Sequence, residues 1–469
     1  MQVGSQSVHR TCLFLLAFAV LLPAILLRPP KWLSDFDQYF YVSIAYDLLH
    51  HGVFSNGAFD NVESTKTVPP PGRFFGPIYP GLVAVLAGLD PRFGKAVACI
   101  VEVNERVHEG SQCEAYDRPV RIVHAALLAG GVLAIALASE VLFLGVFWLT
   151  GVLAVLALLA DVDLFSFVMT ESATFFLYSL AAWLLIRGLK APTFDRLLLA
   201  GLAFGLLTLT RTAYLALAVV CPVLILLASR AVGTSGRKVA CQMLGLALGW
   251  AVVIAPWLAR NAVSTGHLGL TEEYGSAALI ERFAYNSMTE AEFLLAFPYC
   301  LPGIGEPIAS HLAESNAMDR FVYYKPNSFF HAGRGHRDKL VEEYGRLDPL
   351  IMRLIAAEFR ENPWRHLLVS VPLGWCGMWV GGWLGLLLVP FFGLAIVTAE
   401  RPKKVFLVLY SAPAFAMLVL HALIANQYTR YNLILIGPFS IATAWLIKRL
   451  FDWSRSELFG RASNSGDAR

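Results

Sequence analysis

The chain has 469 residues, of which 57% are hydrophobic and only 15% are charged. Soluble domains carry roughly 25% charged residues, and a mean hydropathy of +0.59 means more apolar side chains than a fold surrounded by water can bury. The net charge of +3 is too small to indicate a nucleic-acid partner. Because the apolar residues come in blocks long enough to cross a bilayer, the composition predicts an all-α, multi-pass transmembrane helix bundle.

The first apolar block covers residues 11–27 and precedes Arg28. No small-x-small cleavage site comes before Arg28, so we expect an uncleaved first helix rather than a signal peptide. A polar, aromatic-rich segment, residues 31–118, follows it. Within that segment, residues 76–89 are apolar but too short to span comfortably, which favours a helix that lies on the membrane surface or dips into it.

Six further crossings are expected before residue 258, where apolar blocks alternate with short polar or basic interruptions. They cover residues 120–160, as two helices joined by a tight turn near Glu140, and then 165–186, 197–209, 213–227 and 239–257. A second polar segment, residues 258–365, separates these crossings from the last part of the bundle.

Charge decides how the last part of the chain crosses the membrane. The block 366–397 is long enough for one crossing or for two short ones. The basic residues at 401–404 and Lys448-Arg449 both favour the cytoplasm by the positive-inside rule, and only a single crossing places both clusters there. Crossings at 405–424 and 431–447 then complete about ten helices with both termini inside.

This topology defines one transmembrane domain, residues 1–450, that includes the polar segments 31–118 and 258–365 on its outer face. Residues 451–469 are expected to form a cytoplasmic tail without regular structure. The protein is therefore expected to be embedded in a lipid bilayer, and we expect this bilayer to be a bacterial inner (plasma) membrane.

Seven cysteines are divided between apolar and polar surroundings. Four lie in apolar stretches and are expected to pack as small hydrophobic residues: Cys12, Cys221, Cys241 and Cys376. The other three, Cys99, Cys113 and Cys300, lie in segments placed outside the cytoplasm, where disulfides form. A Cys99–Cys113 bridge is a hypothesis, because spacing alone does not fix connectivity.

Two carboxylates, Asp35 and Asp37, follow the first helix directly and are flanked by five aromatic residues. One interpretation is an interfacial aromatic belt with carboxylates that are merely solvated. The other interpretation makes one aspartate a general base in a partly dehydrated pocket, where proton transfer needs a positioned carboxylate.

The surroundings of Asp37 resemble the first-loop motif of membrane-embedded glycosyltransferases with the C-type fold, above all protein O-mannosyltransferases and the aminoarabinose transferases that modify lipid A. The resemblance recurs along nearly the whole chain, in the order and at the spacing of the family's motifs. The matching elements are Asp37 with Tyr41, Pro77-Ile78-Tyr79-Pro80, Thr170-Glu171-Ser172, Gly205-Leu206-Leu207-Thr208-Leu209-Thr210-Arg211, Pro256-Trp257-Leu258-Ala259-Arg260-Asn261 and Thr429-Arg430-Tyr431.

The resemblance implies inverting transfer of a sugar from a polyprenyl-phosphate donor on the extracytoplasmic face. It implies that Asp37 is the catalytic aspartate, with Asp35 as a secondary candidate. Many relatives carry an acidic residue where this chain has Gln38, a difference that bears against a two-carboxylate mechanism. We expect a lipid or saccharide acceptor, since the chain has no room for the luminal repeats of the protein-modifying relatives.

A phosphate leaving group gains negative charge as the sugar departs, and arginine suits it because its planar fork engages two phosphate oxygens. The candidates at the outer rim are Arg73, Arg211, Arg260 and Arg430. For each of them the alternative is a side chain that anchors to lipid headgroups. Tyr41, Tyr79, Glu171 and Tyr431 are candidate acceptor or pocket residues, and for Glu171 helix capping is the alternative.

The remaining polar residues indicate structure rather than chemistry. His124 and His421 lie in apolar runs and are expected to pack between helices, and residues 331–337 are expected to form a mobile turn. Residues 339–359 predict one amphipathic helix, which lies on the membrane or roofs the pocket.

No cofactor is expected, and a metal is neither implied nor excluded, because no His, Cys and Asp residues have metal-ligand spacing. A polysaccharide polymerase or ligase and a secondary transporter are the alternative functions. A transporter would need charges within the membrane and a repeat between the two halves, and neither is found in the sequence.

Overall fold

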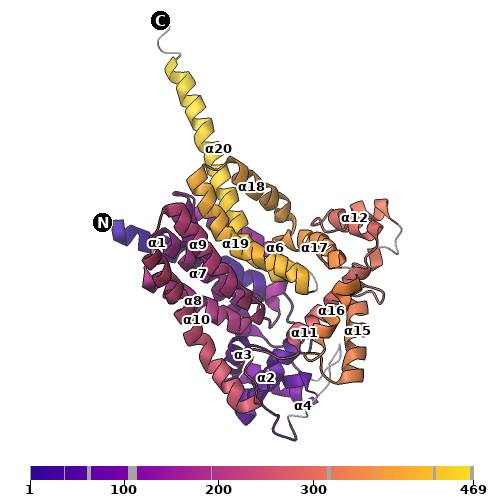
Figure 1. The fold of residues 1–469 in the computed structure, drawn as a ribbon. Coiled ribbons are helices and arrows are strands. Elements are labelled where there is room, and N and C mark those ends of the chain that lie inside the picture. Colours follow the sequence, from indigo (N-terminus) through magenta and orange to yellow (C-terminus); the bar gives the residue numbers. More distant parts are fainter. Residues whose placement is uncertain are drawn as a thin grey trace.

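The computed structural model describes residues 2–35, 37–60, 65–103, 113–191, 193–313, 318–361, 363–425 and 429–464. None of these residues forms a β-strand. A bundle of long helices carries a layer of shorter helices at one end and along one side (Figure 1). The predicted all-α fold is therefore confirmed.

Eleven helices in the described part of the chain make up the bundle. They are α1 (Gln2–Leu26), α5 (Arg118–Leu142), α6 (Phe147–Ala160), α7 (Glu171–Lys190), α8 (Phe194–Thr210), α9 (Leu217–Val232), α10 (Gly236–Thr265), α17 (Pro363–Met378), α18 (Gly385–Thr398), α19 (Arg401–Ile424) and α20 (Ile436–Asn464).

Within the described residues, seven helices are long and apolar enough to cross a membrane, and the bent pair of α17 and α18 raises the number to eight if it is one span. The protein is thus an integral, multi-pass membrane protein. Each of the ten predicted crossings has a helical counterpart, but α6 with 14 residues and α8 with 17 fall short of the ~20 residues that a straight crossing needs.

Helices α7 and α8 lie inside the bundle. The first residue of α7 and the last residue of α8 both lie at the candidate site. The apolar window of α7 is 78% buried, whereas that of α1 is only 22% buried, so α1 presents most of its surface to lipid. Glycines bring α8 against α10, because a Cβ at Gly201 or Gly249 would collide with carbonyl oxygens of the opposite helix. This close packing fixes the end of α8, where Arg211 follows Thr210.

Two turns determine how the bundle is threaded. The predicted turn near Glu140 lies just beyond it, where α5 ends at Leu142 and Gly145 adopts a φ of 78° before α6 begins. The predicted single crossing over residues 366–397 consists of two helices, α17 and α18, which are bent by 110° at their junction. Gly381 and Gly382 both have positive φ there, and the Gly381 amide donates to the Asp161 carboxylate at 2.8 Å.

The outer layer consists of two groups of helices from the two polar segments. The first group is α2 (Gln38–His51), α3 (Ile78–Leu89) and α4 (Pro91–Val103), and the second is α11 (Tyr274–Phe283), α12 (Glu290–Tyr299), α13 (Gly305–Leu312), α15 (Phe329–Tyr344) and α16 (Ile351–Glu361). Short 3₁₀ turns link the helices: η1 (Gly57–Phe59), η2 (Val162–Ser166), η3 (Thr212–Ala216), η4 (Ala284–Ser287), η5 (Gly382–Leu384) and η6 (Thr429–Leu435).

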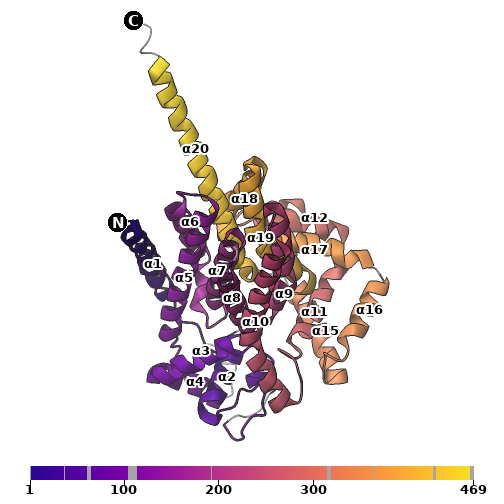
Figure 2. The same cartoon turned by 60° about the vertical axis from the view of Figure 1, so that its left-hand side comes forward.

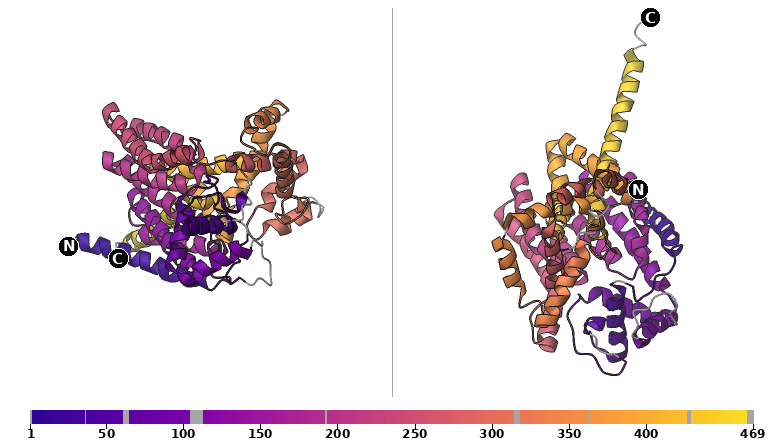
Figure 3. Two further views of the ribbon diagram at one scale, coloured as in Figure 1. Left: turned by 90° about the horizontal axis from the view of Figure 1, so that it is seen from below. Right: turned by 90° about the vertical axis from the view of Figure 1, so that its right-hand side faces the viewer.

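Figure 2 shows the first group of helices at the opposite end of the bundle from the N-terminus and the far end of α20. Seen from below, the second group lies beside the bundle (left panel of Figure 3). The two polar segments meet through the ion pair of Arg73 with Glu272.

The structure differs from three sequence-based expectations, two about the second polar segment and one about the C-terminal tail. Residues 339–359 form two helices rather than one, because Gly345 ends α15 with a φ of 74°. Residues 331–337, expected as a mobile turn, belong to α15, whose first turn is capped by the Ser328 hydroxyl. Helix α20 continues to Asn464, well beyond the expected start of an irregular tail at 451, while residues 465–469 lie outside the described part.

Two disulfides hold the outer layer. The hypothetical Cys99–Cys113 bridge is formed, and it closes the end of α4 onto the approach to α5. Cys376, expected as a packing residue of an apolar stretch, instead pairs with Cys300 and ties the end of α12 to α17. The sequence did not reveal this pair, because the two cysteines are 76 positions apart.

Candidate active site

Asp37 lies in the turn between α1 and α2, immediately before the first residue of α2. Its side chain is 45% exposed, and its carboxylate accepts a hydrogen bond from Arg430 at 3.2 Å. The neighbouring Gln38 is fully buried and holds the turn in place. Its amide donates to the Trp32 and Asp35 carbonyls and accepts from the Val168 amide at 2.7 Å.

The role of Gln38 was not recognised in the sequence, where it was noted only for its departure from an acidic residue. The local sequence does not indicate this role, since the Val168 amide that Gln38 binds is 130 positions away. In the structure, Gln38 fixes the backbone that presents Asp37, so it is a positioning residue rather than a reacting one.

Arg430 and Arg211 approach Asp37 from two breaks in the bundle. Arg430 belongs to η6, which precedes α20, and Arg211 separates α8 from η3. Glu171, the first residue of α7, lies between them: its Oε1 is 3.8 Å from Arg430 Nε and 3.9 Å from Arg211 Nη1. Its side chain is only 5% exposed, so one buried carboxylate is shared by two guanidinium groups.

Tyr431 completes this arrangement from η6. The Arg211 guanidinium lies 4.1 Å from the centre of the Tyr431 ring, and that of Arg430 lies 5.2 Å from it. An aromatic face stabilises a cation that is partly withdrawn from water. We call Asp37, Glu171, Arg211, Arg430 and Tyr431 the charged cluster.

The charged cluster faces a wide cavity of about 1550 Å³, which Asp35, Asp37, Arg211, Arg430 and Tyr431 help to line. Typical pockets for a single small ligand measure roughly 300–1,000 Å³. This cavity therefore has room for two substrates side by side. Asp35 and Asp37 both line the cavity, but the ion pair with Arg430 is formed by Asp37.

Tyr41 and Tyr79 lie behind the charged cluster rather than in the wide cavity. Tyr41 lines a smaller recess with Asp37 and Glu171 and packs against the rings of Phe75 and Tyr79. Burial, followed by the nearby Asp37 carboxylate, raises the pKa of the Tyr41 phenol, so that it stays protonated. Tyr79 is fully buried, and its hydroxyl bonds to His124 at 3.0 Å.

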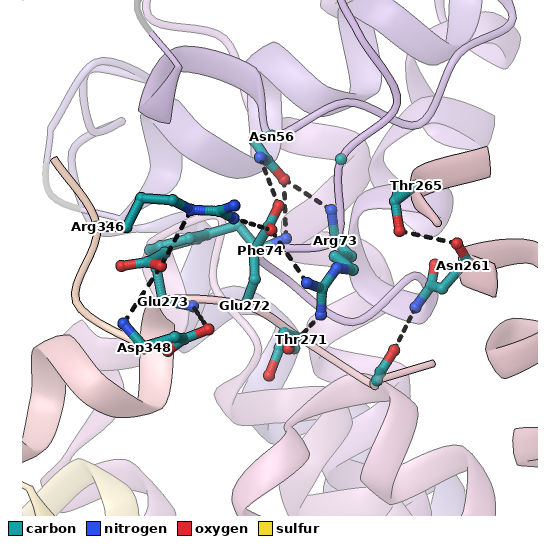
Figure 4. Close-up of polar contacts among 12 residues, drawn as sticks. Asn56, Arg73, Phe74, Asn261, Thr265, Thr271, Glu272, Glu273, Arg346 and Asp348 are labelled. Carbon is teal, nitrogen blue, oxygen red and sulfur yellow. Dashed lines mark hydrogen bonds and ion pairs between the residues drawn. The ribbon is translucent and has the colours of Figure 1, made fainter. Parts of the chain in front are cut away.

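Arg73 and Arg260 are used in contacts that join the two outer segments, and Figure 4 shows those of Arg73. Arg73 pairs with Glu272 at 3.3 Å and donates to the Thr271 carbonyl at 3.1 Å. The Asn56 side chain accepts from the amides of Arg73 and Phe74 beside them.

Arg260 donates to the Gly72 and Phe54 carbonyls and packs over the ring of Trp257. Neither Arg73 nor Arg260 contributes to the cavity wall formed by the charged cluster. The structure thus separates the four predicted arginines into two beside Asp37 and two that hold the outer segments together.

Tyr274 is a site residue that the sequence did not indicate. It opens α11, packs against Phe75, and lines both the wide cavity and the smaller recess. Burial, followed by Tyr431, raises the pKa of its phenol. No motif surrounds Tyr274, so only the three-dimensional placement of α11 reveals it.

The remaining sequence candidates are two histidines and the basic residues of α15, of which His421, Arg334 and Arg337 line the wide cavity. His124 bonds to Tyr79 and to the Phe165 carbonyl, and His421 bonds to Asn432. In α15, Arg337 pairs with Glu281 at 2.5 Å, while Arg334 lies over the Phe330 ring. These contacts support the interpretation of the two histidines as packing residues.

Comparisons with known proteins yield a likeness of fold only. No protein-family model matches the chain, and no curated relative is found. ArnT from Cupriavidus metallidurans, solved with bound undecaprenyl phosphate, is similar over 98% of this chain and 64% of its own, with a TM-score of 0.47 and 13% identity.

The archaeal oligosaccharyltransferase AglB from Archaeoglobus fulgidus, solved with an inhibitory peptide and a dolichol-phosphate, is similar over 99% of this chain. The match covers 52% of the AglB chain, with a TM-score of 0.48 and 13% identity. This chain therefore spans less than two thirds of the length of either structure.

Proposed function

We propose that this protein is an inverting glycosyltransferase that moves a sugar from a polyprenyl-phosphate donor to a lipid or saccharide acceptor. The observation that carries the proposal is the charged cluster: one half-exposed carboxylate stands beside two guanidinium groups at the edge of a wide cavity. The sequence motifs that place Asp37, Arg211 and Arg430 in the order of the family support the same chemistry.

Arg211 and Arg430 are the proposed phosphate ligands. A guanidinium fork engages two oxygens of a phosphate, and its charge stabilises the negative charge that grows on the leaving group. Glu171 and Tyr431 hold the two cations in position before the donor arrives, so little reorganisation is needed during the reaction. Arg73 and Arg260 are not assigned to the binding of the sugar donor, because their guanidinium groups already form hydrogen bonds with backbone carbonyls of the protein.

Asp37 is the proposed general base. In the absence of donor its carboxylate is paired with Arg430. A donor phosphate competes for that guanidinium, and the Asp37 carboxylate is then released toward the acceptor. The acceptor hydroxyl oxygen forms the new bond to the anomeric carbon as the carbon–oxygen bond to phosphate breaks. Asp37 takes the hydroxyl proton, and polyprenyl phosphate leaves with the electron pair.

The proposed site lies on the extracytoplasmic side of a bacterial inner membrane. The Cys99–Cys113 and Cys300–Cys376 bridges in the outer layer are typical of an oxidising compartment. The basic residues Arg187 and Lys190, at the last turn of α7, favour the cytoplasm. A lipid-linked donor suits this side, because it reaches the cavity laterally through the bilayer.

A transfer assay with purified protein in liposomes tests this function. Polyprenyl-phosphate donors with radiolabelled sugars are offered together with extracted membrane lipids and envelope saccharides. We expect label to appear in an acceptor, with inversion at the anomeric carbon. Label that crosses the membrane without a new glycosidic bond would support a transporter, and use of diphosphate-linked donors alone would support a polymerase or ligase. Either result would overturn the proposal.

A further inference from the structure

Helix α16 has three distinct faces, and one of them is exposed apart from a contact between the rings of Phe359 and His366. Leu354, Ile355 and Glu358 turn toward α11 and α17, and Glu358 accepts a hydrogen bond from Asn286 at 2.5 Å. Met352, Ala356 and Phe359 form the next stripe, at the i, i+4, i+7 spacing of one helix face. All three residues of this stripe are exposed, Met352 to 71%.

The exposed stripe continues into the membrane bundle. Helix α17 begins two positions after α16 ends, and it belongs to the bent pair that is apolar enough for a membrane span. Its outward side chains Trp364, Leu367 and Leu368 are also exposed, Trp364 to 70%. Since α17 belongs to a helix pair that is apolar enough to lie in a bilayer, the simplest cover for the adjoining stripe of α16 is the surface of the same bilayer.

The third face of α16 is basic. Arg353 and Arg360 are exposed next to the apolar stripe, and Glu361 is the exposed acid of this helix, since Glu358 is turned inward. A helix with apolar residues on one side and arginines beside them is typical of the boundary between headgroups and acyl chains, where it is attracted to anionic lipids.

We propose that α16 is a membrane-surface helix whose Met352, Ala356 and Phe359 stripe enters the outer leaflet, while Arg353 and Arg360 bind anionic lipid headgroups. The inference rests on the membrane bundle and on the exposure of this one helix, and it is independent of the transfer reaction. It places the wall of the wide cavity formed by α15 at a fixed height above the bilayer, because α15 and α16 are joined through Gly345.

Site-specific labelling of the full chain in vesicles tests the proposal. The exposed free cysteines Cys12 and Cys241 are replaced by serine, Cys221 stays because it is buried, and the four remaining cysteines are paired. An environment-sensitive fluorophore is then attached to Met352→Cys or to Ala357→Cys. Ala357 is exposed too but lies on another face of the same helix, so it is the matched control.

In phosphatidylcholine vesicles that contain phosphatidylglycerol, lipids spin-labelled near the headgroup should quench the label at 352 severalfold more strongly than the label at 357. Iodide in the water should quench the label at 357 more strongly. A label at Ala356, on the same stripe, should repeat the result for 352 if one variant perturbs the fold.

Two results would overturn the proposal. Equal access of iodide to both positions would show that α16 lies in water. Protection of position 352 from both iodide and spin-labelled lipid would show that protein, such as a second copy of the chain, covers the stripe.

The headgroup assignment has its own test, with Arg353→Gln and Arg360→Gln combined. The double variant should lose the additional quenching that phosphatidylglycerol gives over pure phosphatidylcholine. An unchanged dependence on phosphatidylglycerol would overturn that assignment.

Discussion

Asp37 and Arg430 are 393 positions apart in the chain, yet they form one ion pair at the edge of the wide cavity. Each belongs to a short irregular segment that follows or precedes a long helix: the turn before α2 for Asp37, and η6 before α20 for Arg430. Irregular backbone at a membrane helix end is tolerated where it lines a cavity. The chemistry of the site is therefore concentrated in a few residues at helix breaks.

Replacing Asp37 with asparagine tests its assignment as base. Asp37→Asn keeps the shape of the side chain but removes its ability to accept a proton, so turnover should fall by about 10²–10⁴-fold. Asp35→Asn is the matched control, since Asp35 lines the same cavity without the ion pair to Arg430, and it should cost much less. The measurement is the initial rate of sugar transfer by purified variants. Equal losses in both variants would mean that the base is another residue.

The arginines can be distinguished in the same way. Arg430→Ala should weaken retention of polyprenyl phosphate and lower turnover, because it removes a phosphate ligand. Arg73→Ala should instead leave the KM for donor unchanged but lower the free energy of unfolding by about 1–3 kcal/mol, since it removes one cationic partner of Glu272, which keeps Arg346 and Asn56. Ligand retention and thermal unfolding in detergent measure the two effects. A raised donor KM in Arg73→Ala would return Arg73 to the site.

At the scale of elements, the junction of α17 and α18 depends on backbone conformations that only glycine adopts without strain. Gly381→Ala forces an alanine to a φ of 78° and brings its Cβ within 3.1 Å of the Ala157 side chain. We expect it to destabilise the protein by about 1–2 kcal/mol. Gly374→Ala lies within α17, and its Cβ would make only an ordinary van der Waals contact with Ala422 at 3.9 Å, so it should be neutral or stabilising. Thermal unfolding compares the two variants, and equal stabilities would contradict the account of this bend.

The elements show where sequence patterns suffice and where they fail. Apolar blocks located the crossings, because a bilayer imposes their length and composition. They did not reveal the bend at Gly381, since a broken span and a straight one have the same composition. They also did not reveal the Cys300–Cys376 pair, because its partners come from a polar segment and an apolar one.

Prediction of the candidate site was limited because residues that meet in the structure are far apart along the chain. The sequence motifs led to Asp37, Glu171, Arg211 and Arg430, which lie together in the structure. They did not distinguish Arg430 from Arg73, because the partner of Arg73, Glu272, is about 200 positions away and belongs to the other outer segment. Which of the two arginines lines the wide cavity depends on packing, and local sequence does not show it.

At the scale of the whole molecule, the two outer segments must share one side of the membrane. Reporter fusions after Lys66 and Asp338 should therefore read as extracytoplasmic, and fusions after Lys190, Lys238 and Lys404 as cytoplasmic. Alkaline phosphatase and a fluorescent protein, active on opposite sides, give the measurement. A cytoplasmic signal at Lys66 would place Asp37 on the wrong side for a lipid-linked donor and would exclude the proposed mechanism.

Val168 and Met169, which lie next to each other between η2 and α7, reach both halves of the site. The Val168 amide holds Gln38 beside Asp37, and the Met169 sulfur lies 3.3 Å from Arg430. The proposed base and the proposed phosphate ligand are thus both held by one pair of neighbouring residues, and their spacing does not depend on the tilt of separate helices. Membranes of different thickness change helix tilt, but this spacing should stay the same. Turnover should consequently vary little with the acyl-chain length of the host lipid.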